Sequence, residues 1–144
     1  VEWVPVCPEV EMGMGTPPER IQLVEAADGL PSAGRRVRLR GVTSQADWTA
    51  RMDPFARQRV PSLTELHLCG FVLKKNSPSC GPSDVPVLSS SSGVTAGRGL
   101  FAEALYTAMP GLPIEDEQSL RDPGARARFL AEVRRFQAEH YAHR

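Results

Sequence analysis

Residues 66–82 read LHLCGFVLKKNSPSCGP, an apolar run that ends at two lysines and opens into a loop. The run over residues 66–73 is nearly all apolar, which is typical of a central strand buried on both faces, as in a parallel sheet. Residues 76–82 are rich in serine, proline and glycine and can only form a loop. The stretch therefore predicts a buried parallel strand with a cysteine-bearing loop at its carboxyl end.

Strand and helix patterns alternate on both sides of this stretch. Apolar residues alternate with charged ones over residues 20–25 and 36–40, which predicts two half-buried strands joined by a turn. The other expected strands cover residues 1–7, 84–88 and 112–114, and a loop is expected over 89–99. One helix should start at Thr43 or Ser44, carry Trp48 and Met52, and be interrupted or restarted at Pro54. A second helix is expected over about 100–109, and a last one from Asp122 with an apolar stripe at Phe129, Leu130, Val133 and Phe136. This alternation indicates an α/β domain with a mostly parallel sheet flanked by helices.

The composition is that of an ordinary globular protein. The chain has 144 residues, of which 41% are hydrophobic and 24% charged, enough for one domain with a core of its own. Seventeen basic residues balance seventeen acidic ones, so charge does not favour nucleic acid or an anionic membrane surface as a partner. No apolar run is long enough to cross a bilayer, and no leader pattern opens the chain. We therefore expect a soluble, cytoplasmic protein with no nucleic-acid or membrane partner.

Three cysteines, Cys7, Cys69 and Cys80, cannot all pair within one chain. An odd and sparse set favours free thiols, metal ligands or a nucleophile over a framework of disulfides. None of the spacings is a zinc pattern. Cys69 stands inside the apolar run, where a cysteine is most often a small buried hydrophobic residue.

Two of the predicted loops carry a cysteine each. One begins with Cys7-Pro8-Glu9, and the other spans residues 77–81. In an open parallel α/β sheet, sites form in loops at the carboxyl ends of strands, so we expect Cys7 and Cys80 to be neighbours. Two thiols beside a carboxylate and hydroxyl groups form a plausible set of ligands and catalysts. Taken alone, however, a cysteine is as often a packing residue, Glu9 a surface carboxylate and Ser77 a turn residue.

Two motifs and three supporting stretches occur together in the order that a known family has. The motifs are CPE at residues 7–9, followed by GxGTP at 13–17, and FxLKxxSPSCG at 71–81. The supporting stretches are residues 42–49, 99–105 and 112–117, so that the similarity spans nearly the whole chain. With these motifs, the chain resembles the bacterial thiouracil desulfidase family, which long carried only an uncharacterised-domain label.

The resemblance implies a flavodoxin-like α/β fold and a [4Fe-4S] cluster that three cysteines bind, leaving one iron open. Cys7 and Cys80 match two of the ligands, Glu9 matches the catalytic carboxylate, and Ser77 matches the serine that accompanies it. The open iron would bind the sulfur of a small thiolated heterocycle such as 2-thiouracil. Water would attack the carbon, with proton transfer through Glu9 and positioning by Ser77, and no net electron transfer would be needed.

The third ligand is where the sequence departs from the family. In the family it is a cysteine in a loop after the first strand, and this sequence does not contain that segment. Cys69 matches no family ligand, and we do not expect it to serve as the third. We therefore expect a single domain over residues 1–144 that lacks the family's first strand and helix and binds its cluster weakly. A second copy of the chain or a further domain could cover the exposed sheet edge, and the terminal helix over 122–144 could pack on that domain.

Further readings stay open on the sequence alone. Gly97 and Gly99 precede a predicted helix, where they could bind an anion or form a simple tight turn. With Ser79 they are candidate substrate-binding residues. Besides the desulfidase, two other functions compete: a truncated, non-catalytic interaction or regulatory module, and a redox sensor that uses the thiols of Cys7 and Cys80 directly.

Overall fold

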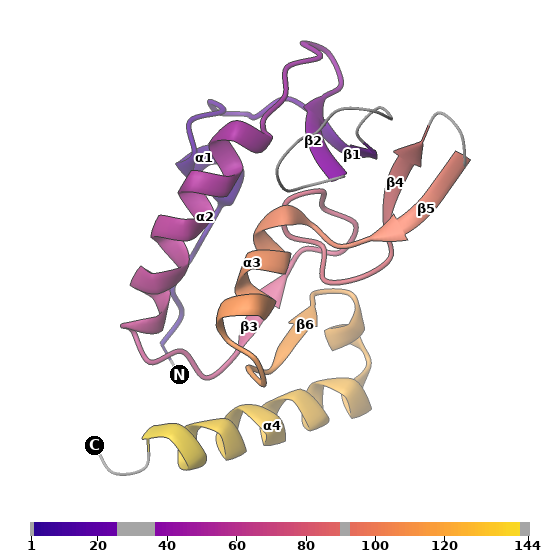
Figure 1. The fold of residues 1–144 in the computed structure, drawn as a ribbon. Helices are drawn as coiled ribbons and strands as arrows, with labels where there is room; N and C mark the ends of the chain where they lie inside the picture. The colour runs from indigo at the N-terminus through magenta and orange to yellow at the C-terminus, as the bar shows by residue number, and fades with distance from the viewer. Residues whose placement is uncertain (1, 26–36, 90–92, 142–144) are drawn as a thin grey trace.

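Short strands alternate with helices along the chain (Figure 1). The computed structural model describes residues 2–25, 37–89 and 93–141. Its elements are α1 (Pro8–Glu11), β1 (Ile21–Glu25), β2 (Val37–Gly41), α2 (Thr49–Thr64), β3 (Phe71–Leu73), β4 (Val85–Ser89), β5 (Gly93–Gly97), α3 (Leu100–Ala108), β6 (Ile114–Asp116), a 3₁₀ turn (Ser119–Arg121) and α4 (Pro123–Tyr141). The predicted α/β class is confirmed.

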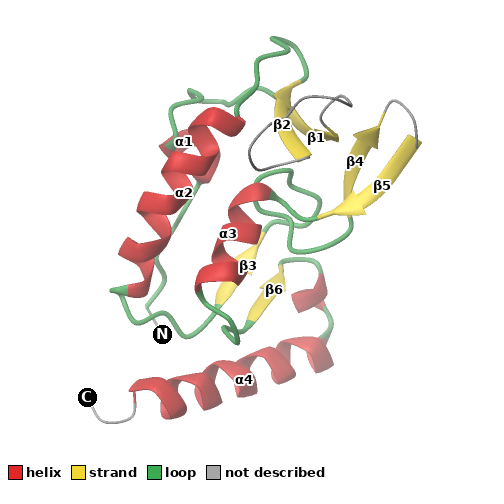
Figure 2. Ribbon diagram, in the orientation of Figure 1, coloured by secondary structure: helices red, strands yellow, loops and turns green. Residues whose placement is uncertain are grey.

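The described strands form two sheets, which Figure 2 shows as separate groups of arrows. Four strands pair in the order β2-β1-β4-β5, and β3 pairs with β6. The β1–β4 and β3–β6 pairs are parallel, whereas β1–β2 and β4–β5 are antiparallel. The four-stranded sheet is therefore mixed, whereas the two-stranded sheet is parallel.

The strand predicted over residues 66–73 is wrong in its length and its position. The strand β3 covers only Phe71–Leu73, and the partner that the structure describes for it is β6. Leu66 is 53% exposed, and its amide donates to the carbonyl of Leu63 in a turn that follows α2. His67 has a φ of 56°, in the left-handed region, which an extended strand does not allow. The first part of the apolar run is therefore a turn and loop after α2, and only its last three residues form a strand.

Two further elements differ from the prediction. Residues 2–7 form no strand: Trp3 is 75% exposed, and Cys7 is the N-cap of α1, with Pro8 in the first turn. Proline there has its φ preset for a helix and lacks the N–H that a strand ladder would use. Residues 93–97, predicted as loop, form β5 and pair with β4, while residues 90–92 lie outside the described part of the chain.

The long helix α2 begins later than predicted and is not interrupted. It starts at Thr49, whose amide donates to Asp47 Oδ1 at 2.9 Å, and it continues through both Pro54 and Pro61. A proline inside a helix removes a backbone hydrogen bond, so packing must hold the helix together. The packing comes from one buried face, made of Thr49, Met52, Ala56, Val60 and Leu63.

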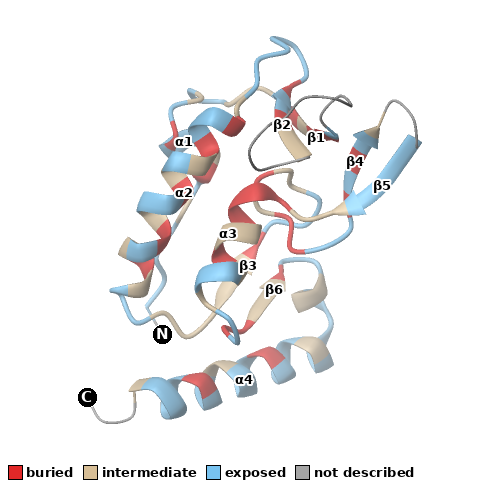
Figure 3. Ribbon diagram, in the orientation of Figure 1, coloured by how far each residue is buried: buried red, intermediate tan, exposed pale blue. Residues whose placement is uncertain are grey.

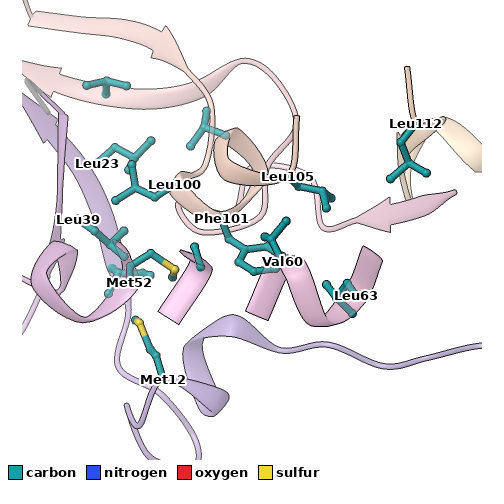
Figure 4. Close-up of a cluster of buried hydrophobic side chains, with 14 of the residues drawn as sticks. Met12, Leu23, Leu39, Met52, Val60, Leu63, Leu100, Phe101, Leu105 and Leu112 are labelled. Atoms are coloured by element: carbon teal, nitrogen blue, oxygen red, sulfur yellow. The ribbon is translucent and has the colours of Figure 1, made fainter. Parts of the chain in front are cut away.

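The core lies between α2, α3 and the inner face of the four-stranded sheet (Figure 4). Phe101 on α3 is fully buried, and its ring centroid lies 5.9 Å from that of Phe55 and 6.4 Å from that of Phe71. Leu23 of β1 and Leu39 of β2 are also fully buried on this side. Because the cysteine-bearing loop is hydrogen-bonded to the first turn of α3, this packing fixes the helix on which the loop rests.

The Phe101→Ala substitution should destabilise the domain strongly. Removing a fully buried ring leaves a cavity among its neighbours, which costs about 3–5 kcal/mol in the free energy of unfolding. Chemical denaturation of the purified variant measures this loss. Leu130→Ala is the control, because Leu130 on α4 is 42% exposed and its truncation should change stability by about 0.5 kcal/mol or less. Equal losses for the two variants would contradict the assignment of the core.

The last helix covers one end of the molecule and remains largely exposed (Figure 3). Phe129 and Phe136 are buried and Val133 is half-buried, but Leu130 of the predicted apolar stripe points outward. Whether α4 packs on a further domain, and whether a second copy covers an outer strand, stay predictions. Among the described helices, none is long and apolar enough to cross a membrane.

Candidate functional site

The loop over residues 77–81 is a tight turn held by its own serine. The amide of Gly81 donates to the carbonyl of Ser77 at 2.7 Å. The Oγ of Ser77 accepts from the amide of Cys80 at 3.1 Å and from that of Ser79 at 3.3 Å. A serine that bonds to the backbone two and three residues ahead stabilises such a turn. The backbone around Cys80 is therefore fixed before any ligand binds.

The same loop is attached to the first turn of α3. The amide of Leu100 donates to the carbonyl of Pro78 at 3.1 Å, and the amide of Phe101 donates to that of Ser79 at 2.8 Å. The amide of Ala102 also donates to the carbonyl of Ser79, at 3.1 Å. The first amides of a helix have no partner within the helix, and here the loop supplies one for these three. These three donors are therefore already in use and do not face an external anion.

Gly99 is the point of closest approach between loop and helix. A Cβ atom there would lie 2.5 Å from the carbonyl carbon of Ser79 and 2.7 Å from the backbone nitrogen of Cys80. Gly97 lies in β5, and a Cβ atom on it would lie 2.7 Å from Cγ2 of Val87. Both glycines thus have a packing reason to lack a side chain. Their contact with a substrate stays a prediction.

The Gly99→Ala substitution should push the loop away from α3. The φ of Gly99 is −56°, so alanine can adopt the backbone conformation, and the clash with backbone atoms is the whole effect. Overpacking of this kind costs about 1–3 kcal/mol in the free energy of unfolding. Gly124→Ala is the control, since its Cβ would lie 3.3 Å or more from side-chain ends that can move. Thermal unfolding compares the two, and a Gly99→Ala protein as stable as wild type would contradict the close approach.

A chain of hydrogen bonds joins the carboxylate of Glu9 to the serine loop. Ser79 Oγ donates to Glu9 Oε2 at 2.8 Å and lies 3.0 Å from Ser77 Oγ. Because a hydroxyl has one proton and Ser79 gives its proton to Glu9, Ser77 must be the donor toward Ser79. Ser79 is fully buried, whereas Glu9 and Ser77 are half-buried. The two predicted catalytic residues are thus connected, and Ser79 is the connection.

The thiols of Cys7 and Cys80 belong to this same site. The pKa of Cys80 is raised to about 11, chiefly by burial and to a lesser extent by the nearby Glu9 and Cys7, while contacts with the hydroxyl groups of Ser79 and Ser77 act against this rise. Cys7 is exposed and Cys80 is part-buried, and both are free of disulfides. A thiol with such a pKa is protonated at neutral pH unless a metal ion displaces the proton.

Cys69 lies elsewhere. It precedes β3, whereas Cys80 follows the carboxyl end of that strand, and its Sγ donates to the carbonyl of His67 at 3.5 Å. Its neighbour Gly70 packs against Phe129 and Val133 of α4. Burial raises the pKa of Cys69, but no charge from the Cys7 and Cys80 site contributes. Within residues 2–25, 37–89 and 93–141, no three His, Cys, Asp or Glu side chains gather into a metal-ligand set.

Comparison with known proteins agrees with this arrangement of motifs. A model of the 2-thiouracil desulfurase family matches residues 1–117. The chain belongs to this family. The fold resembles that of a solved [4Fe-4S]-dependent thiouracil desulfidase, with a TM-score of 0.58 and 22% sequence identity, over 87% of this chain and 72% of that one. A search of curated proteins found no match.

The family assignment covers the whole site and leaves out the last helix. Cys7, Glu9, the 77–81 loop and Gly99 all fall within the matched residues, while α4 begins at Pro123, after they end. The resemblance inferred from the CPE and SPSCG motifs is therefore confirmed. At 22% identity the solved structure shows a shared fold, and the roles of individual residues remain to be tested on this chain.

Two features of the site escaped the sequence analysis. The first is the buried hydroxyl of Ser79, which contacts Glu9 and Ser77, while its contact with a substrate stays a prediction. The S-P-S spacing was a usable signal, because a turn that caps itself with Ser77 brings the next serine back toward it. Glu11 and Arg59, which lie beside Cys7, carried no signal in the sequence.

Proposed function

We propose that this chain replaces the sulfur of a small thiolated heterocycle, such as 2-thiouracil, with oxygen from water, in a non-redox reaction that depends on an iron–sulfur cluster. Membership of the 2-thiouracil desulfurase family supports the reaction class. The observation that carries the proposal is the bond from Ser79 to Glu9 directly beside Cys80, in the same site as Cys7. A carboxylate fixed next to two thiols combines a proton acceptor with soft metal ligands.

The described part of the chain supplies two of the thiols that a cluster would need. Iron–sulfur clusters are held by cysteine thiolates, and Cys7 and Cys80 would be two of these ligands. No third thiol reaches the site within the described residues, since Cys69 precedes β3 and Cys80 follows it. A [4Fe-4S] cluster bound there would supply an open iron, a Lewis acid with affinity for the thiocarbonyl sulfur.

The side chains of the chain itself would handle water and protons. Glu9 accepts a proton from the water molecule that attacks the carbon, which places hydroxide character on the attacking oxygen. The bond from Ser79 keeps Oε2 of Glu9 turned toward the loop, so the other oxygen can face the water. In the overall reaction the oxygen of water forms the new C=O bond, the C=S bond breaks, and the sulfur leaves with the two protons of water as hydrogen sulfide. No electron is gained or lost.

The test is anaerobic reconstitution with iron and sulfide, followed by an assay with 2-thiouracil. We expect brown protein with up to about four iron and four sulfide per chain, the content of a [4Fe-4S] cluster, which two thiols would hold weakly, and formation of uracil and sulfide in equal amounts. Protein that has not been reconstituted is the control and should form neither product. A fully loaded protein that leaves 2-thiouracil and related thiocarbonyl heterocycles unchanged would refute the proposal.

The alternative of a thiol-based redox sensor finds less support. The thiolate is the reactive form of cysteine, and sensor cysteines have a lowered pKa. The pKa of Cys80 is raised to about 11, chiefly by burial, which disfavours the thiolate at neutral pH. Coordination to iron compensates for this penalty, whereas thiol exchange in solution does not.

A further inference from the structure

Cys7 has few anchors of its own. It follows residues 2–6, which form no regular element, and it is exposed together with Trp3 and Val4. At the N-cap of α1 its side chain makes no capping hydrogen bond. Its carbonyl accepts from the amide of Glu11 at 2.9 Å within the short helix. These contacts within residues 2–11 do not fix the position of the thiol relative to the rest of the domain.

The carboxylate of Glu11 provides such a tie. Its Oε2 accepts from the amide of Cys7 at 2.8 Å, which satisfies a donor that the helix leaves open. Its Oε1 lies 3.0 Å from Arg59 Nε, an ion pair without the geometry of a hydrogen bond. The two oxygens of one carboxylate therefore connect the backbone of Cys7 to α2. The pair is only about a quarter to a third exposed, with side-chain exposures of 25% for Arg59 and 33% for Glu11.

Arg59 is itself held in place on α2. Its NH1 donates to Ser62 Oγ at 3.1 Å, and the hydroxyl of Ser62 donates back to the carbonyl of Arg59 at 2.6 Å. The next residue, Val60, is buried in the core, as is Leu63 one turn later. The guanidinium group is thus held on a helix that packs into the core, and its ion pair links Glu11 to that helix.

We infer that Glu11 and Arg59 are positioning residues that hold the backbone of Cys7 so that its thiol stays beside Cys80. The role in cluster binding rests on the proposed function, whereas the restraint on the backbone exists in the metal-free protein as well. Groups that orient a metal ligand without touching the metal typically change metal affinity by about 10–100-fold when they are removed. Glu11 acts through the backbone amide of Cys7, and Arg59 acts through Glu11.

The test compares four variants with wild type. Glu11→Ala removes both contacts of the carboxylate, and Arg59→Ala removes the ion pair together with the bond to Ser62 Oγ but keeps the acceptor of the Cys7 amide. Glu11→Gln keeps an acceptor for the Cys7 amide and loses the charge, and Arg59→Lys restores a cation at the same position. Glu139→Ala is the matched control, since it breaks the exposed Arg135–Glu139 pair on α4. Circular dichroism and thermal unfolding establish that each variant is folded.

The first measurement uses metal-free protein and needs no activity. Hydrogen exchange of the Cys7 amide, followed by NMR, should be at least about 10-fold faster in Glu11→Ala and Arg59→Ala, intermediate in Glu11→Gln and Arg59→Lys, and unchanged in Glu139→Ala. The second uses reconstituted protein. Loss of iron to a chelator should be about 10–100-fold faster in the two alanine variants, and the EPR signal of the reduced cluster should broaden.

The outcomes separate this inference from the proposed function. If wild type assembles no cluster, the proposed function fails, and the exchange of the Cys7 amide still decides whether Glu11 and Arg59 restrain it. Unchanged exchange in Glu11→Ala and Arg59→Ala would overturn the restraint. Faster exchange with unchanged iron loss and an unchanged EPR signal would overturn the role in cluster binding.

Discussion

Cys80→Ala should abolish binding of the cluster. The substitution removes one of the two thiols that the described residues bring to the site, and alanine has no atom that can replace the ligand. After anaerobic reconstitution the variant should hold iron and sulfide at background level and remain colourless. Turnover of 2-thiouracil should fall below detection with it. Iron and acid-labile sulfide assays give the result directly, without dependence on the substrate.

The matched control is Cys69→Ala. It also removes a part-buried thiol, but one that lies before β3 and contacts the carbonyl of His67. We expect it to keep wild-type iron content and activity. The two variants should unfold at similar denaturant concentrations, because each change removes a single sulfur atom. A Cys80→Ala protein with about four iron atoms would contradict the assignment of Cys80.

Glu9→Gln should reduce the rate of desulfidation by roughly 10²- to 10⁴-fold, the range expected when a general base is removed. Glutamine has nearly the same shape, and its amide oxygen can still accept from Ser79 Oγ. The loop should therefore stay intact while the proton acceptor is lost. Steady-state kinetics should show the loss in kcat rather than in KM, since proton transfer occurs after binding.

Iron content separates this role from a structural one. Glu9→Gln should load the same amount of iron and sulfide as wild type, whereas a ligand or folding role would lower it. Glu132→Gln, on the exposed surface of α4, is the control and should behave as wild type. A Glu9→Gln enzyme that keeps its full kcat would exclude Glu9 as the proton acceptor.

Local patterns in the sequence predicted the regular elements whose burial follows a simple period. The alternation over residues 20–25 and 36–40 corresponds to β1 and β2, and the helix expected from residue 100 is α3. The run over residues 66–73 misled because a short apolar run does not by itself specify a strand, and its first five residues form a turn and loop after α2. The terminus of α2 and the left-handed backbone at His67 decide between these readings, and both depend on packing against distant residues.

For the candidate site, the residue types were predictable and most of the contacts between them were not. The CPE and SPSCG motifs named Cys7, Glu9, Ser77 and Cys80, and the structure places them in one locality. The route from Ser77 to Glu9 through Ser79 depends on how the turn closes, which only the three-dimensional structure specifies. The ion pair of Arg59 with Glu11 joins α2 to α1, and charged residues on a helix give no sign of which partner they will meet.

The bond between Ser79 and Glu9 joins positions that are 70 residues apart along the chain. Contacts of such high sequence separation form late in folding, because closing the intervening loop costs conformational entropy before the contact contributes any stabilisation. A growing chain would therefore expose Cys7 well before the segment that carries Cys80 has been synthesised and attached to α3. Iron that meets the unfinished chain finds Cys7 without Cys80 beside it, so maturation with the cluster should follow the completion of folding rather than accompany synthesis.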